Sequence, residues 1–120
     1  MKKVTDRHFK TFKKWCEHYR TIFNLRNWKV YYKRGVSGEQ EQFAQTGTDL
    51  GGYVATIWLC NEWPEEVELN ENELKIIARH EMLHVLFARF KENAYARHAT
   101  KDELAESEEE VVRVLVGLLK

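Results

Sequence analysis

Residues 70–91 constrain the fold of this chain more than any other segment. They predict one long helix, because apolar residues recur at helical spacing and cover nearly its whole circumference. Asn70 is expected to be the N-cap, with Glu73 three residues later, as in a capping box. A helix that is apolar on almost every side is stable only when other elements cover it. The sequence therefore predicts a central, buried helix, with this apolar set: Leu74, Ile76, Ile77, Leu83, Val85, Leu86, Phe87 and Phe90.

The other segments predict an α+β domain built around that helix. Aromatic residues and lysines alternate at helical spacing in residues 7–23, where Asp6 is the expected N-cap. At 120 residues the chain has room for one domain, residues 1–120. The expected order is α-β-β-β-α-α, with a small, mostly antiparallel three-stranded sheet packed on the helices. The remaining elements are expected at 28–33 (strand), 35–38 (hairpin connection), 39–46 and 53–60 (strands) and 101–119 (a glutamate-bearing helix).

Cysteine content and hydropathy narrow the class of protein. The two cysteines, Cys16 and Cys60, lie far apart and outside any C-x-x-C spacing, which argues against a disulfide framework and a cysteine-based zinc site. No apolar run is long enough to cross a bilayer, and the charged N-terminus contains no apolar signal segment. These features predict a cytoplasmic protein with no membrane partner.

Charge is unevenly distributed, although the formal net charge is zero. Residues 1–34 contain eleven Lys and Arg against two Asp and Glu, whereas residues 35–120 contain eight against seventeen. Such a basic segment is typical of a surface for nucleic acid or an acidic partner. It is also typical of the solvated face of an amphipathic helix, which is the commoner case and the one we expect.

The chemistry of the chain is concentrated in His80-Glu81-Met82-Leu83-His84, an H-E-x-x-H motif in the middle of the central helix. Residues four apart lie on the same helix face, so His80 and His84 can offer imidazole nitrogens to one metal ion. Glu81 lies beside them, where it can take a proton from water that the metal activates. In a buried helix, two unpaired histidines and a glutamate would be costly without a metal. The motif therefore predicts a zinc site with Glu81 as general base.

A catalytic zinc normally has three protein ligands and one open position. The extended pattern H-E-x-x-H-x-x-G-x-x-H is absent, because Phe87 and Phe90 stand where its glycine and third histidine would be. That excludes the metzincin type. The third ligand is expected after Phe90, where the candidates are His98 and the glutamates of the last helix: Glu103, Glu106, Glu108, Glu109 and Glu110.

With this motif and this order of elements, the chain resembles the gluzincins, in particular the minimal gluzincins and short phage and prophage metallopeptidases. The resemblance covers residues 28–119 and implies zinc-dependent hydrolysis of peptide bonds, with a third ligand from a glutamate on a following helix. It also implies that the strand before the motif helix, here 53–60, is an edge strand that pairs with an extended peptide substrate. Tyr95 and His98 are the candidates for stabilising the oxyanion.

Among the glutamates, the helical periodicity of residues 101–119 favours Glu108 as the third ligand. The apolar side of this helix has Glu108 near its middle and Glu109 at its edge, whereas Glu106 and Glu110 point to solvent. A carboxylate directed into a core is costly unless it is paired or bound to metal. Glu109 is the runner-up, and Glu103, in the first turn, and His98 rank below it. The apolar side consists of Leu104, Val111, Val112, Leu115, Leu118 and Leu119.

Two other functions fit the same residues. In the first, the protein is a non-catalytic binding module that zinc stabilises, and its basic N-terminal helix binds nucleic acid or a protein partner. In the second, it is a protease tethered to DNA, similar to the SprT-like zinc proteases, but these usually have a third histidine that this chain lacks at the expected place. The leading prediction is a zinc metalloendopeptidase that acts on a peptide or protein substrate, with nucleic acid as the weaker expectation.

Overall fold

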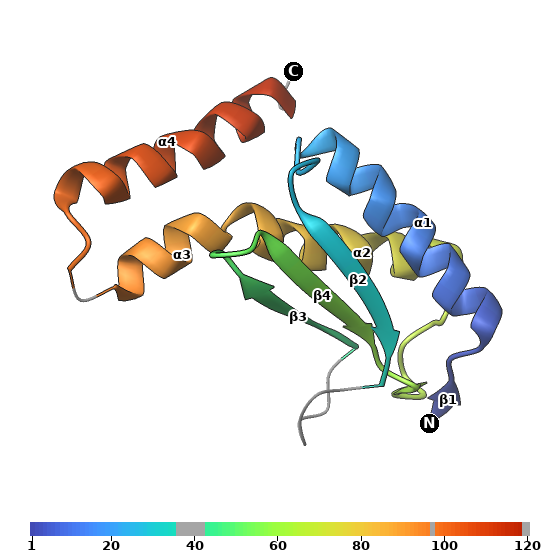
Figure 1. Ribbon diagram of the computed structural model, residues 1–120. Coiled ribbons are helices and arrows are strands. Elements are labelled where there is room, and N and C mark those ends of the chain that lie inside the picture. Colours follow the sequence, from blue (N-terminus) through green and yellow to red (C-terminus); the bar gives the residue numbers. More distant parts are fainter. Residues whose placement is uncertain (36–42, 97, 119–120) are drawn as a thin grey trace.

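The computed structural model describes residues 1–35, 43–96 and 98–118, which form an α+β arrangement of helices and two small sheets (Figure 1). Helices α1 and α2 lie together on one side of the larger sheet, and α3 and α4 extend beyond it. The elements, in chain order, are β1 (Lys2–Lys3), α1 (Asp6–Ile22), β2 (Lys29–Arg34), β3 (Ala44–Asp49), β4 (Val54–Leu59), β5 (Glu62–Trp63), α2 (Glu71–Leu86), α3 (Ala88–Tyr95) and α4 (Lys101–Leu118).

Helix α1 forms where the sequence predicts it, with one correction at its start. Thr5, and not Asp6, is the N-cap: its hydroxyl accepts a hydrogen bond from the amide of His8, and the His8 ring accepts one from the amide of Thr5. The side chains of Phe12, Cys16 and Tyr19 are buried because they recur at the spacing of one helix face. The face they form packs against α2.

The three-stranded sheet has the order β2-β4-β3, which differs from the expected topology. Strand β4 lies between the other two, antiparallel to β3 but parallel to β2. The expectation of a hairpin between the first two strands is therefore wrong, since β2 and β3 do not pair, and the sheet is mixed instead of mostly antiparallel. Residues 36–42, which include most of the expected hairpin connection and part of the expected strand 39–46, lie outside the described residues.

Alternation along β4 gives the sheet one covered face. Ala55, Ile57 and Leu59 are fully buried against the helices, whereas the residues between them are only partly buried. A second, two-stranded sheet pairs β1 with β5 and so fixes the N-terminus beside the loop that precedes α2. This short pairing was not expected from the sequence, because two-residue strands carry no periodicity.

Helix α2 begins as expected but ends earlier and is less buried. The Asn70 side chain accepts a hydrogen bond from the amide of Glu73, which confirms the predicted N-cap. The helix ends at Leu86, and after Phe87 the chain continues as α3, although this stretch contains no proline or glycine. Only one face of α2 is buried, so the expectation of a helix covered on all sides is wrong: Ile76 is 37% exposed and Phe87 is 39% exposed.

Helix α4 packs on α3 and contributes little to the core. Its buried residues are Ser107 and Val111, while Val112, Val116 and Leu118 of its apolar side are exposed. Across the described ranges, no helix combines the length and the hydropathy that crossing a bilayer requires. The packed core thus belongs mainly to α1, β4 and α2, which also hold the motif residues in place.

Candidate metal centre

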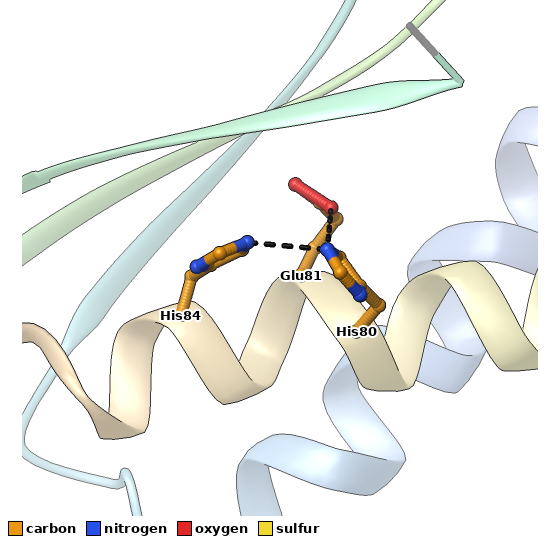
Figure 2. A group of neighbouring side chains, drawn as sticks. All are labelled: His80, Glu81 and His84. Carbon is orange, nitrogen blue, oxygen red and sulfur yellow. Dashed lines mark hydrogen bonds and ion pairs between the residues drawn. The ribbon is translucent and has the colours of Figure 1, made fainter.

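The three motif side chains leave α2 in two directions. The two histidines point to solvent, and Glu81 points to the buried side of the helix. His80 and His84 are exposed, whereas Glu81 is buried at 5% exposure. In Figure 2 the two imidazoles lie side by side on consecutive turns, and the Glu81 carboxylate lies behind them on the side of the strands. The helix therefore presents two solvent-accessible ligand atoms next to one carboxylate that is shielded from water.

The distance between the two imidazoles fits a zinc ion. The Nε2 atoms of His80 and His84 are 3.2 Å apart. Zinc–nitrogen bonds of about 2.0–2.1 Å at a tetrahedral angle require about 3.3–3.4 Å between two ligand nitrogens. A Glu81 carboxylate oxygen, Oε2, lies 3.8 Å from His80 Nε2, and one ligand atom from each of the three residues can be chosen within 4.8 Å of the others. The residues that the motif predicts as ligands are thus positioned to share one ion.

Glu81 lies between two neighbouring elements, β3 and α1, and is held by a hydrogen bond from β3. Thr46 of β3 donates a hydrogen bond from Oγ1 to Glu81 Oε1 at 2.8 Å. On the other side lies α1, where burial raises the pKa of the Cys16 thiol and the charge of Glu81 raises it further. Cys16 is fully buried, so it behaves as a small neutral core residue. The Glu81 carboxylate therefore has one oxygen fixed by Thr46 and the other on the side of the histidines.

A pocket of about 510 Å³ lies between β3 and α2, in front of the motif. Its wall on the sheet side is β3, which is an edge strand because β4 occupies the centre of the sheet. The assignment of 53–60 as the edge strand is therefore wrong: β4 pairs on both sides, and β3 takes the edge beside the histidines. The lining residues are Phe43, Ala44, Gln45, Thr46, Thr48, Ile77, His80, Glu81, His84 and Lys91.

The structure does not bring Glu108 to the histidines. Glu108 lies on α4 with an exposed side chain, and its expected place on the inner side of that helix is taken by Ser107. The predicted rotation of α4 is wrong at this position, because Ser107 and Val111 are the buried residues of the helix and Val114 and Leu115 pack partly against the core, whereas Glu108 is exposed. Among the described residues, the group that could hold a metal consists of His80, Glu81 and His84.

Three of the other acidic candidates of α4, Glu106, Glu109 and Glu110, lie in exposed ion pairs. Arg89 of α3 contacts Glu106 at 3.4 Å and Glu110 at 3.1 Å, so these two glutamates face α3 while remaining exposed. Glu109 pairs with Arg113 along α4 at 3.5 Å. Glu103 is exposed in the first turn, where its amide donates to the Thr100 hydroxyl. The two Arg89 contacts link α4 to α3, whereas those of Glu109 and Glu103 are local to α4.

Neither candidate for oxyanion stabilisation lies in the pocket lining. Tyr95, at the end of α3, is 81% exposed, and His98 is exposed in the connection to α4. Two pocket residues, Thr46 and Lys91, were not singled out from the sequence. No local pattern could have found them, since their position depends on the order of the strands and on the break after α2.

Comparison with known proteins adds no assignment: no family model, curated protein or solved structure matches this chain significantly.

Proposed function

We propose that this protein is a zinc-dependent metalloendopeptidase of the minimal gluzincin type, with His80 and His84 as zinc ligands and Glu81 as general base. The observation that carries the proposal is the pair of accessible imidazole nitrogens 3.2 Å apart beside a buried carboxylate. This separation is also within hydrogen-bonding range of two neutral imidazoles, but it is the separation that two nitrogen ligands of one tetrahedral ion require. When bound, zinc supplies a Lewis acid that acidifies water and polarises a carbonyl.

Glu81 is the residue that moves the proton. With Oε1 held by Thr46, the other oxygen, Oε2, can accept a proton from the attacking water as the water oxygen bonds to the peptide carbonyl carbon. The same oxygen then delivers this proton to the amide nitrogen as the carbon–nitrogen bond breaks, which leaves a carboxylic acid and an amine. Burial of Glu81 limits competing contacts with bulk water.

The edge position of β3 supports an extended peptide as substrate. An extended peptide can add to an exposed sheet edge through main-chain hydrogen bonds. On the side facing the pocket, no strand within residues 43–96 or the other described ranges pairs with β3. A peptide placed along this edge passes His80 and His84, because both line the same pocket as β3.

A third protein ligand is expected for a catalytic zinc, and the resemblance to the gluzincins still implies a glutamate of α4, of which Glu108 is tested first. Because Glu108 is exposed on α4 and outside the clustered group, this role requires α4 to approach α2. The contacts that hold α4 on α3 include the exposed ion pairs of Arg89, which are weak enough to be exchanged. Glu109 is next in order, as its side chain is also exposed on the same helix.

The proposal is tested by replacing Glu81 with glutamine and measuring zinc content and hydrolysis separately. Glu81→Gln should retain about one zinc per chain and lose at least ~100-fold in the rate of cleavage of an unstructured protein such as casein, the usual scale for a general base. Glu92→Gln is the matched control, since Glu92 is an exposed glutamate on α3 and its replacement should change neither quantity. His80→Ala should lose the metal.

The outcomes separate the peptidase from a binding module. If the wild-type protein takes up no zinc, the metal site is wrong. If zinc binds while the wild-type protein and Glu81→Gln are equally inert on a range of unstructured substrates, the ion is structural and the peptidase proposal fails.

A further inference from the structure

The face of the three-stranded sheet opposite the helices is lined by aromatic and basic side chains. Along β2, Lys29, Tyr31 and Lys33 are exposed, whereas Val30 and Tyr32 pack against the core. The strand register places Lys33 beside Trp58 of β4, so Tyr31 and Trp58 are diagonal neighbours on this face. Helices α1 and α2 lie on the other side of the sheet and α3 and α4 extend beyond it, so no helix of the described ranges covers this face of β2 and β4 (Figure 1).

The Tyr31 ring is exposed on this face, and the Trp58 ring is partly exposed. Tyr31 is 54% exposed, which is unusual for a large side chain in the middle of a strand. Trp58 is partly buried and does not belong to the hydrophobic core. A Cβ atom at Gly47 of β3 would lie 3.2 Å from the Trp58 indole, so the ring rests on the β3 backbone where that strand has no side chain. One side of the indole is thus supported by the sheet.

The charges on this face favour an anionic ligand. Several basic residues of the first 34 are engaged elsewhere: Lys14 pairs with Glu71, Arg20 with Glu17 and Arg34 with Asp6. The basic segment is therefore not one continuous arm. Lys29 and Lys33 flank Tyr31, and no ion pair of either lysine is found within the described parts of the chain. Among the described residues of the three strands, the acidic one on this face is Asp49, which lies at the far corner on β3.

We propose that this open face, formed by Lys29, Tyr31, Lys33 and Trp58, binds single-stranded nucleic acid. Unpaired bases stack on exposed aromatic rings, and lysines beside those rings contact the phosphates. A duplex keeps its bases stacked inside and would use the lysines alone. The aromatic pair therefore favours single-stranded over double-stranded nucleic acid. Because every base can stack on a ring, we expect little preference for the nucleotide sequence.

This surface is separate from the proposed peptidase site. Thr46 points to the Glu81 side of the sheet, whereas Gly47, the next residue of β3, lies under Trp58 on the open side. Successive residues of a strand face opposite sides, so a peptide in the pocket and a nucleic acid on the open face do not compete. The binding needs neither zinc nor Glu81, and Glu81→Gln should bind nucleic acid like the wild-type protein. Failure of one proposal leaves the other intact.

The experiment is a fluorescence anisotropy titration of the full chain with labelled oligo-dT and oligo-U of roughly 12 nucleotides, a length within the site sizes of sheet-based binders. Tyr31→Leu should weaken binding roughly 5- to 100-fold, the scale of losing one stacked base. Tyr31→Phe keeps a ring and should retain wild-type affinity. Because Tyr31 is half exposed, neither variant removes core packing, and circular dichroism checks the fold.

The lysines are tested with a charge-matched control. The double variant Lys29→Ala/Lys33→Ala should weaken binding and reduce the slope of log affinity against log salt by about 1.4, or about 0.7 per lost phosphate contact. Arg7→Ala/Lys10→Ala removes the same charge from exposed positions of α1 and should leave the affinity unchanged.

Four results would overturn the proposal. These are no binding of either oligonucleotide at low salt, equal losses in the two double variants, equal affinity for a duplex of the same length, and a Tyr31→Leu variant that binds as tightly as Tyr31→Phe. The last result, together with an effect of the lysines, would identify a general polyanion surface with no stacking.

Discussion

The chain up to Leu86 and the two helices that follow it differ in how they are held. The first region, residues 1–35 and 43–86, which we call the body, contains nearly all of the hydrophobic core, from Phe12 of α1 to Met82 and Val85 of α2. The second region, α3 and α4, contributes Ala88 and Val111 to the core, and Val116 is 65% exposed. The motif residues belong to the body, so their geometry is fixed by packing. Any ligand that α4 supplies is held by much weaker contacts.

The largest expected difference between the two regions is in the cost of losing a core side chain. Phe12→Ala should destabilise the protein by about 3–5 kcal/mol, because a fully buried aromatic side chain leaves a cavity. Val111→Ala, in α4, should cost about 1.5 kcal/mol, since two methyl groups are removed from a small contact. Urea unfolding followed by circular dichroism measures both. Equal costs would mean that α4 is as firmly packed as the body.

Replacing Glu108 tests whether α4 joins the metal site. If Glu108 is the third ligand, Glu108→Ala should weaken zinc affinity by more than about 100-fold, because even groups behind metal ligands are worth about 10- to 100-fold. The measurement is a competition titration with a chelator of known affinity.

Glu106→Ala is the control for this titration, since Glu106 contacts Arg89 instead of the motif. An unchanged affinity for Glu108→Ala would exclude that residue, and Glu109→Ala would be measured next. If neither matters, zinc is held by the body alone.

A substitution on the sheet side tests how firmly the body fixes Glu81. Thr46→Val keeps the shape of a β-branched side chain but removes the donor to Oε1 at 2.8 Å. Losing a hydrogen bond to a buried charged group should cost about 1.5–3 kcal/mol in unfolding free energy. Thr46→Ser restores the hydroxyl and should recover most of this loss.

Thr48→Val is the control for Thr46→Val, because Thr48 lies on the same strand and in the same pocket but is exposed. Its replacement should change stability by less than about 0.5 kcal/mol. Equal effects at the two threonines would show that strand propensity, and not the contact with Glu81, accounts for the change.

The smallest expected effect is at the contact between α3 and α4. Arg89→Ala removes the ion pairs to Glu106 and Glu110 and should lower global stability by at most about 1 kcal/mol. Amide hydrogen exchange in 101–118 should nevertheless become faster, because this contact ties α4 to the rest of the molecule. Arg113→Ala breaks a pair within α4 and should leave that exchange nearly unchanged. Exchange that responds equally to both variants would argue against Arg89 as the tie.

The sequence could predict the features that depend on local residues, but not those that depend on contacts between distant segments. The helices α1 and α2, strand β4 and the Asn70 cap were predicted, because each depends on local periodicity or on one side chain. The strand order was not, since the parallel pairing of β2 with β4 joins segments that are distant in the chain. The periodicity predicted that Glu108 faces inward on α4, but the inward residue is Ser107. An amphipathic pattern fixes the rotation of a helix only when the helix packs against a large partner surface. The roles of His80, Glu81 and His84 remain predictions, although their spacing fits a shared ion.

The central position of β4 has a consequence for the newborn chain. Strands β2 and β3 leave the ribosome before β4, and each pairs with β4 but not with the other. Neither outer strand can complete its hydrogen bonds until residues 54–59 have been synthesised, and such non-local pairing is slow. Helix α2 emerges later still, so Thr46 meets Glu81 only after most of the chain exists. The proposed site, in which Thr46 positions Glu81, is therefore completed only after the sheet has closed.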